Sequence, residues 1–200
     1  KYEYNRFFDS FEHYYSLYHH RNLELWAEYA DGKVTKEELN RQRYLYPLKA
    51  VGICDSALAK AYEKDALAAI PTKSKLMPHA REVLEYLSSK YNLYILSNGF
   101  KELQSHKMHS SGIDKYFKKI VLSDDIGVLK PWPEIFYFAL SATQSELKDS
   151  LMIGDSWEND IAGAAGVGMH QVFYNLSGRM DLPFMPTYQI SDLKELLDLL

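Results

Sequence analysis

The sequence lacks the features that would link it to an oxidising compartment or to a membrane. Cys54 is its one cysteine, which excludes an internal disulfide and a cluster of thiolate ligands around a metal. It has no signal peptide and no run of about 18 apolar residues, so we expect a soluble cytoplasmic protein. The sequence begins with Lys1 and so has no initiator methionine.

The chain also has no large excess of charge of either sign. The chain has 23 lysines and arginines against 27 aspartates and glutamates, a formal net charge of −4, and it has no basic run. Nucleic-acid polymers and anionic membranes bind strongly basic surfaces, so we expect neither as a partner. The sequence does have 46% hydrophobic and 14% aromatic residues over 200 positions, enough for the core of one α/β domain with an appendage.

Residues 1–74 are predicted to form an all-helical domain. Apolar and aromatic residues recur there at spacings of three and four, which is typical of amphipathic helices. Thr35 and Asp55 are placed as N-caps of two helices, and the first of these is expected to end near Pro47. The aromatic stripe is interpreted as core packing, and this part shows no catalytic cluster. Substrate contact is the alternative for Arg21, Trp26, Arg43 and Tyr44.

Strands and helices are predicted to alternate from residue 75 to residue 200. The expected strands cover 93–97, 120–122, 151–154, 171–174 and 188–190. Pro78 is placed at the start of the first helix, Gly112 at the end of the second and Ser191 at the start of the last. This alternation predicts an α/β fold with a doubly wound, mainly parallel Rossmannoid sheet, beside the α-helical domain.

Polar side chains follow the first two expected strands at the points where these strands end. Ser97, Asn98 and Gly99 follow the first strand, and a serine hydroxyl with main-chain N–H groups at a helix start can hold a phosphate oxygen. Lys130, followed by Pro131, can place a positive charge beside such a phosphate. Each feature by itself is more typical of an ordinary turn or of a surface lysine than of a phosphate site.

Two acids follow the third strand. One loop and the start of a helix separate Asp155 from Asp160, so both carboxylates can point into the crevice at the carboxyl end of the sheet. Oxygen ligands of this kind suit Mg²⁺, which usually takes one or two protein carboxylates, several waters and a substrate phosphate. The alternative is a solvated loop followed by an acid at a helix N-terminus.

In combination, these motifs resemble those of the haloacid dehalogenase (HAD) superfamily. Residues 94–99 look like its second motif, residues 129–131 like its third and residues 154–160 like its fourth, and the preceding helices are similar to its α-helical cap. The whole pattern looks closest to the phosphatases related to pyrimidine 5′-nucleotidases. The first motif, an apolar strand ending in Asp-x-Asp, is missing, since no aspartate is followed two positions later by another. Asp9 is a superficial echo, because Phe11 occupies the acid/base position.

The resemblance implies a role for each candidate residue. Ser97 and the Asn98 amide would hold the transferring phosphoryl group, and Lys130 would bridge phosphate and nucleophile. Mg²⁺ would be the cofactor, with Asp155 as a direct ligand and Asp160 either ligating it or orienting its waters. An aspartate would attack phosphorus, and water would hydrolyse the resulting aspartyl-phosphate.

The strand that carries the first motif should be the central one of the sheet. Its loss would leave two neighbouring strands with unpaired, buried edges, which is costly for a marginally stable domain. We therefore expect a segment of roughly 20 to 45 residues upstream of Lys1 in the natural protein, with the nucleophile and the acid/base on it.

The expected function is that of a Mg²⁺-dependent phosphoric monoester hydrolase of small phosphorylated metabolites, with nucleoside monophosphates as the leading substrates. One alternative is a 2-haloacid dehalogenase, whose chemistry needs no metal and would leave both acids idle. Another is a catalytically silent HAD-fold binding protein. A mutase shares the same motifs, and the sequence is compatible with a monomer and with a homodimer.

Overall fold

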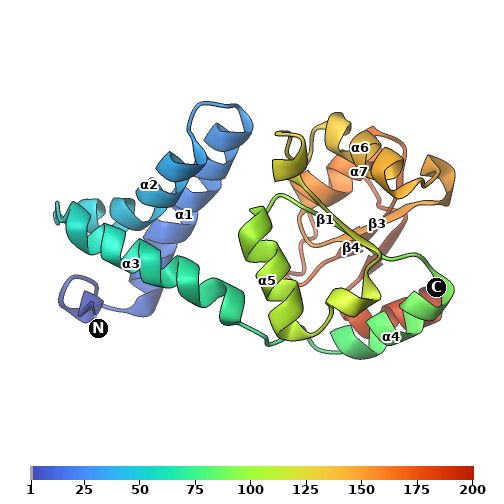
Figure 1. Cartoon of the computed structure of the whole chain (residues 1–200), viewed down its shortest axis with the longest axis horizontal. Helices are drawn as coiled ribbons and strands as arrows, with labels where there is room; N and C mark the ends of the chain where they lie inside the picture. The colour runs from blue at the N-terminus through green and yellow to red at the C-terminus, as the bar shows by residue number, and fades with distance from the viewer. Residues whose placement is uncertain (1) are drawn as a thin grey trace. The chain divides into compact units, whose positions relative to one another are not determined.

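The computed structural model describes residues 2–200, and the chain divides into two compact units, Lys1–Ile70 and Pro71–Leu200. We call them the helical unit and the α/β unit, and describe each by itself (Figure 1). The expected boundary lies a few residues further along the chain. No helix within residues 2–200 is both long enough and apolar enough to cross a membrane.

The helical unit consists mainly of α1 (Phe11–Ala30), α2 (Lys36–Ala50) and α3 (Ser56–Ala69). The two predicted N-caps are confirmed: Thr35 Oγ1 accepts a hydrogen bond from the main chain at 3.2 Å, and Asp55 Oδ1 accepts one at 2.8 Å. The predicted end of α2 near Pro47 is wrong, because the helix continues through this proline. Pro47 is fully buried, and its packing outweighs the backbone hydrogen bond that it cannot donate.

Aromatic side chains fill the core of the helical unit. Tyr14 meets Phe8 edge to face with ring centroids 5.2 Å apart, and the rings of Tyr18 and Tyr44 are 5.7 Å apart. Leu48, in the last turn of α2, is completely buried. The aromatic stripe of α1 therefore packs against α2, as the core interpretation predicts.

The α/β unit alternates strands and helices in the predicted order. Its strands are β1 (Tyr94–Ser97), β2 (Lys119–Leu122), β3 (Leu151–Gly154), β4 (His170–Tyr174) and β5 (Tyr188–Ile190). Its helices are α4 (Ala80–Lys90), α5 (Lys101–Ser111), α6 (Pro133–Thr143), α7 (Gly163–Gly166) and α8 (Leu196–Leu199), with a π-helix at Trp157–Ala162. Every predicted strand agrees with the structure to within one residue at each end.

The helix ends agree with the prediction only in part. Gly112 ends α5 at a φ of +64°, as predicted for a left-handed C-cap. Pro78 lies in a turn before α4 and not inside the helix, because His79 adopts a φ of +60°. Ser191 does not cap the last helical segment. Asp192 does so, because its carboxylate accepts the main-chain N–H two residues further on.

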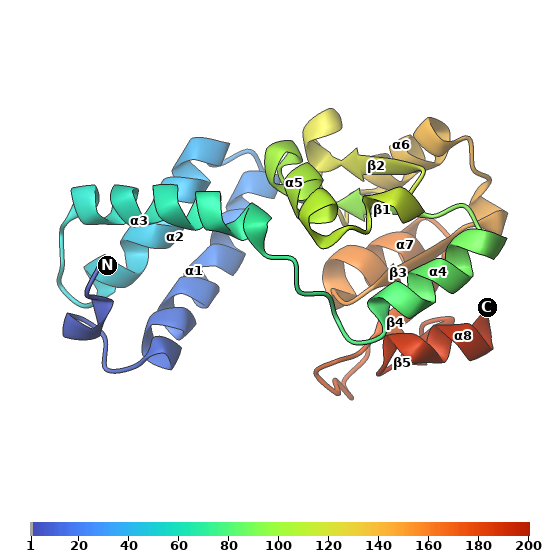
Figure 2. The ribbon, with the colours of Figure 1, turned by 60° about the horizontal axis from the view of Figure 1, so that its bottom comes forward.

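The strand pairs are parallel, as predicted. β1 pairs with β2, and β3 pairs with β4, which in turn pairs with β5 (Figure 2). Within residues 2–200, no ladder joins β1 to β3. Leu96 of β1 and Met152 of β3 nevertheless pack against the same buried cluster, so the two strands lie near one another without pairing. All four residues of each strand are only half-buried, whereas β4 is almost completely buried.

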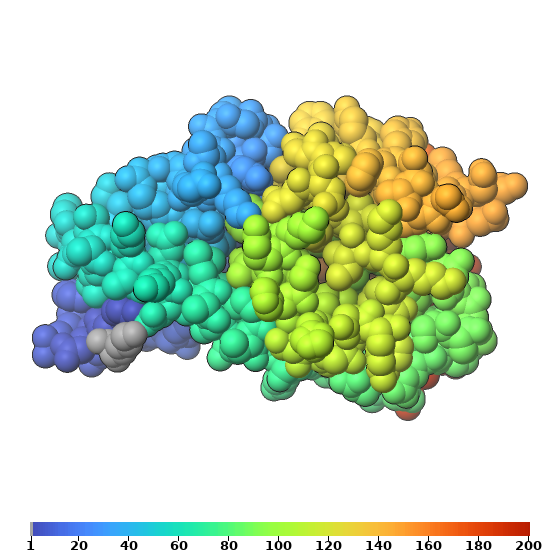
Figure 3. Space-filling model, in the orientation of Figure 1, coloured from blue at the N-terminus to red at the C-terminus, as the bar shows by residue number. Residues whose placement is uncertain are grey.

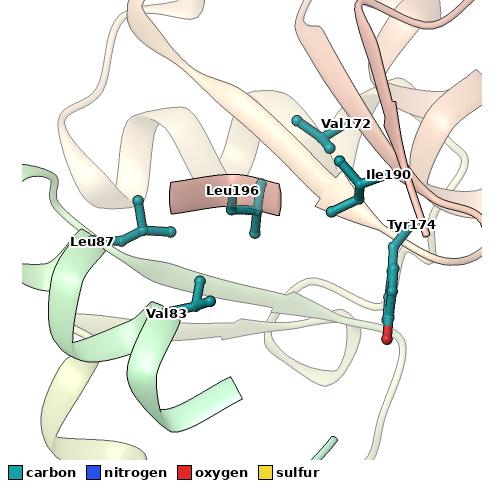
Figure 4. Packing of buried hydrophobic residues seen from close by; sticks show 6 residues of the cluster. All are labelled: Val83, Leu87, Val172, Tyr174, Ile190 and Leu196. Atoms are coloured by element: carbon teal, nitrogen blue, oxygen red, sulfur yellow. The ribbon is translucent and has the colours of Figure 1, made fainter. Parts of the chain in front are cut away.

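Helices cover both faces of the strands (Figure 1). On one face, α4 and α8 pack against β4 and β5 through a buried cluster that Figure 4 shows: Val83, Leu87, Val172, Tyr174, Ile190 and Leu196. On the other face, α6 and α7 pack through a second cluster that includes Ile135 and Phe136. β3 contributes Leu151 and Ile153 to the first face and Met152 to the second, the two-residue alternation of a strand. Most residues of α5 are polar and exposed, and the helix lies at the surface of the molecule in Figure 3.

Leu87→Ala should lower the free energy of unfolding by about 2–5 kcal/mol, because it leaves a cavity in the first cluster. Leu87 is 3% exposed. Leu199→Ala, at a site on α8 that is 36% exposed, is the matched control and should cost much less. Urea unfolding followed by circular dichroism measures both, and equal losses would contradict the packing assigned to α4.

Candidate functional site

A buried ion pair joins two of the predicted site residues. Lys130 Nζ lies 2.6 Å from Asp160 Oδ1, and the two side chains are 9% and 7% exposed. The same ammonium donates a hydrogen bond to the carbonyl oxygen of Leu96 at 2.8 Å. Because opposite charges interact strongly away from water, this pair fastens the Lys130 loop to β1 and to the segment after β3.

The turn after β3 directs the Asp160 carboxylate back over the end of that strand. The Ser156 N–H donates to Asp160 Oδ2 at 3.1 Å, so each carboxylate oxygen has a partner. The π-helix at Trp157–Ala162 begins here. π-Helical segments are rare in proteins as a whole, and many of those known lie at functional sites. A Cβ on Gly154 would lie 2.3 Å from Asp160 Oδ2, so the carboxylate fits only over a glycine.

Asp155 differs from Asp160 in having no partner among residues 2–200. It is exposed at the carboxyl end of β3, and its carboxylate makes no hydrogen bond or ion pair with residues 2–200. No group of three or more His, Cys, Asp or Glu side chains in that range could hold a metal. This donor set does not suit a zinc site with three or four protein ligands. It fits Mg²⁺, which shares one or two carboxylates with waters and a phosphate.

The Ser97 hydroxyl is oriented at the end of β1. Its Oγ accepts hydrogen bonds from the Gly99 N–H at 3.1 Å and from Gln104 Nε2 at 3.2 Å. Both lone pairs are therefore engaged, and the O–H remains to donate to an anionic oxygen. The sequence did not predict Gln104. The one hint in the sequence was the glycine at position 99, which leaves room for a neighbouring side chain. A Cβ there would overlap the Gln104 side chain.

The Asn98 side chain supports the Lys130 loop. Its Oδ1 accepts from the Lys130 N–H at 2.7 Å, and its Nδ2 donates to the Lys130 carbonyl at 2.9 Å. These two bonds hold both main-chain groups of the lysine, directly before the cis peptide bond to Pro131. A phosphate contact from Asn98 would therefore have to come from its main chain.

Arg21 and Tyr44, for which substrate contact is the alternative interpretation, have partners within the helical unit. Arg21 Nη1 lies 2.8 Å from carboxylate oxygens of both Glu24 and Glu28. Tyr44 is 3% exposed, in agreement with core packing. Asp9, the echo of the missing first motif, has a side chain that is 99% exposed and lies in a bend, not at the end of a strand.

A loop after β4 reaches the same turn as Asp160. Arg179 Nη1 lies 2.8 Å from Glu158 Oε1, and this partner holds the pKa of Glu158 below its usual value. The Arg179 guanidinium also lies 5.5 Å from the centre of the Trp157 ring. The sequence analysis assigned no role to Arg179, Glu158 or Trp157, because only the folded chain brings position 179 to this turn.

Comparisons of sequence agree with these motifs. Residues 1–168 match the family of haloacid dehalogenase-like hydrolases. The chain is 31% identical over 182 residues to the HAD-hydrolase YfnB of Bacillus subtilis, covering 90% of this chain and 76% of that protein. It is also 31% identical over 181 residues to the pyrimidine 5′-nucleotidase YjjG of Escherichia coli, covering 90% and 79%.

Comparisons of structure confirm the fold. A crystal structure of YfnB bound to magnesium matches with a TM-score of 0.83 at 29% identity, covering 93% of this chain and 81% of that one. The L-2-haloacid dehalogenase of Xanthobacter autotrophicus matches with a TM-score of 0.73 at 18% identity, covering 92% and 83%, which is a likeness of fold alone. The predicted α/β Rossmannoid core with a helical cap is thus correct, and the chain belongs to the haloacid dehalogenase-like hydrolase family.

Proposed function

We propose that this protein is a Mg²⁺-dependent phosphatase of small phosphorylated metabolites, with nucleoside monophosphates as the leading substrate class. The observation that carries the proposal is the buried Lys130–Asp160 pair beside the unpartnered carboxylate of Asp155. Membership of a hydrolase family and the similarity to a pyrimidine 5′-nucleotidase support it.

Lys130 and Ser97 supply the groups that bind the phosphoryl oxygens. The Lys130 ammonium has three N–H donors, of which Leu96 and Asp160 engage two, so the third is available to a phosphate. The Ser97 O–H donates to a second oxygen. Negative charge is spread over these oxygens in the transition state of phosphoryl transfer, so a fixed ammonium and a fixed hydroxyl lower the barrier.

Asp155 is the direct Mg²⁺ ligand in this proposal. Asp160 takes the water-orienting role of the two expected for it, because its oxygens already accept from Lys130 and from the Ser156 N–H. When bound, Mg²⁺ would neutralise charge on the phosphoryl oxygens.

The nucleophile is proposed to come from a strand outside the 200 residues of this sequence. β1 and β3 each leave an edge unpaired within residues 2–200. A parallel strand ending in Asp-x-Asp would satisfy both edges and bring its first carboxylate to the end of the sheet that carries Lys130. That carboxylate would attack phosphorus and displace the alkoxide oxygen of the substrate, which takes a proton from the second acid and leaves as the alcohol. Water would then hydrolyse the aspartyl-phosphate.

The test is phosphate release by the natural, untagged protein from nucleoside monophosphates and from sugar phosphates. We expect release that EDTA abolishes and that added Mg²⁺ restores. EDTA-resistant halide release from 2-chloropropionate would instead identify a dehalogenase. Mg²⁺ binding without turnover would identify a catalytically silent protein.

The natural protein is predicted to have an intact mass several kilodaltons above the 23.2 kDa of this chain. The excess is the strand that carries the nucleophile. Mass spectrometry of protein purified without a tag from its own source gives the answer, and a mass of 23.2 kDa would refute the upstream strand.

Asp155→Asn should abolish Mg²⁺-dependent turnover and leave the unfolding transition unchanged, because the exposed carboxylate has no partner within residues 2–200. Asp149→Asn is the matched control. Asp149 is exposed just before β3, at the opposite end of the same strand, and its substitution should leave turnover intact. Steady-state phosphate release and thermal unfolding test both variants; normal turnover in Asp155→Asn would show that the metal ligand is misassigned.

Lys130→Met should lower the free energy of unfolding by about 3–5 kcal/mol, because it leaves the Asp160 carboxylate buried without its counter-ion. The double variant Lys130→Met/Asp160→Asn should recover most of this loss. Lys130→Met and the double variant should both lack activity, since the ammonium is needed to bind the phosphate. Urea unfolding of both single variants and of the double variant, with phosphate release in parallel, separates stability from catalysis. An undiminished loss in the double variant would contradict the pairing.

A further inference from the structure

The turn between the two acids carries a buried tryptophan to which the proposed function gives no role. Trp157 is 4% exposed. Its ring meets Phe173 of β4 edge to face at 5.2 Å and Phe184 at 4.8 Å between centroids. Phe184 belongs to residues 175–187, the segment that joins β4 to β5, which we call the clamp loop. The same cluster includes Ile161 and Leu182.

The clamp loop has a fixed internal structure. Asn175, 6% exposed at its start, accepts a hydrogen bond from the Arg179 N–H at 2.8 Å and donates one to the Arg179 carbonyl at 2.9 Å. Arg179 Nε donates to the Asp181 carbonyl at 2.9 Å. The guanidinium is thereby held over Trp157, and it reaches Glu158 at 2.8 Å.

We propose that the clamp loop positions the metal site, with Trp157 and Arg179 as positioning residues that fix the turn from Asp155 to Asp160. This inference rests on the proposed function, because it assigns the Mg²⁺ site to this turn. A π-helical segment is rare, so contacts from outside the helix have to favour it. Burial of the indole and the hold of Arg179 on Glu158 supply such contacts.

The position of Trp157 explains why a small shift of its ring would displace the proposed metal ligands. Trp157 lies two residues after Asp155 and three before Asp160, so a displaced indole ring moves the backbone on both sides. Side chains that orient metal ligands typically change metal affinity about 10–100-fold when they are removed. Partly exposed ion pairs such as Arg179–Glu158, with side chains 34% and 69% exposed, contribute little to stability. Removing Arg179 should therefore weaken metal binding without unfolding the protein.

The chain provides its own optical probe for this test. It has three tryptophans, Trp26, Trp132 and Trp157. Trp26→Phe/Trp132→Phe leaves Trp157 as the only tryptophan of these 200 residues, and its emission should change saturably as Mg²⁺ is added at constant ionic strength; any tryptophan outside them is replaced by Phe in the same way. The companion variant Trp132→Phe/Trp157→Phe, which keeps only Trp26 of α1, should show no change.

The deciding measurement is the Mg²⁺ dissociation constant of the full-length natural protein, by calorimetry and by Trp157 emission. Arg179→Ala keeps the main-chain bonds to Asn175 and should raise this constant about 10-fold or more, with an unchanged unfolding temperature. The matched control Arg81→Ala removes an exposed arginine that binds the main chain at the end of α5, and it should bind Mg²⁺ normally.

The outcomes separate this inference from the proposed function. Normal Mg²⁺ affinity in Arg179→Ala, or calorimetric binding that leaves Trp157 emission unchanged, overturns the positioning role and leaves the phosphatase proposal standing. Absence of Mg²⁺ binding in the unsubstituted protein, with or without inorganic phosphate, overturns both. Weakened binding in Arg179→Ala together with abolished binding in Asp155→Asn supports both.

Discussion

The contact between Lys130 and Asp160 is the interaction on which the arrangement of the candidate site depends. It joins three stretches of chain that are far apart in sequence: the loop before α6, the last residues of β1 and the turn after β3. Further hydrogen bonds to the two partners help to offset the cost of burying an ion pair. Here the Leu96 carbonyl accepts a second N–H of the lysine, and the Ser156 N–H donates to the second oxygen of the acid.

The ion pair also spans the interval in which β1 and β3 do not pair. Lys130 binds a β1 carbonyl, while Asp160 follows β3, so side chains make the link between the strands that a backbone ladder makes elsewhere in the sheet. The proposed nucleophile strand would enter this interval. The proposed phosphate-binding residues thus lie at the same edge of the structure as the unpaired sides of β1 and β3.

The sequence predictions that failed concern helix ends, where competing local interactions differ little in energy. Pro47 lies inside α2 because burial of its ring compensates for a single missing hydrogen bond. Ser191 and Asp192 are both good capping residues, and the geometry of the chain at that point decided for Asp192. Where one residue had no competitor beside it, as at Thr35 or Gly112, the prediction was correct.

The sequence by itself determined the strands, their parallel order and the family, because hydrophobic periodicity and turn residues act over a few neighbouring positions. It also determined that Ser97, Lys130 and the two acids follow the strands in that order. Only the tertiary structure decided how these side chains are arranged: Asp160 is paired with Lys130 while Asp155 has no partner within residues 2–200, Gln104 donates to Ser97, and Arg179 lies over the ring of Trp157. The directions of these side chains depend on contacts between residues up to some 30 positions apart in the chain, which no local pattern encodes.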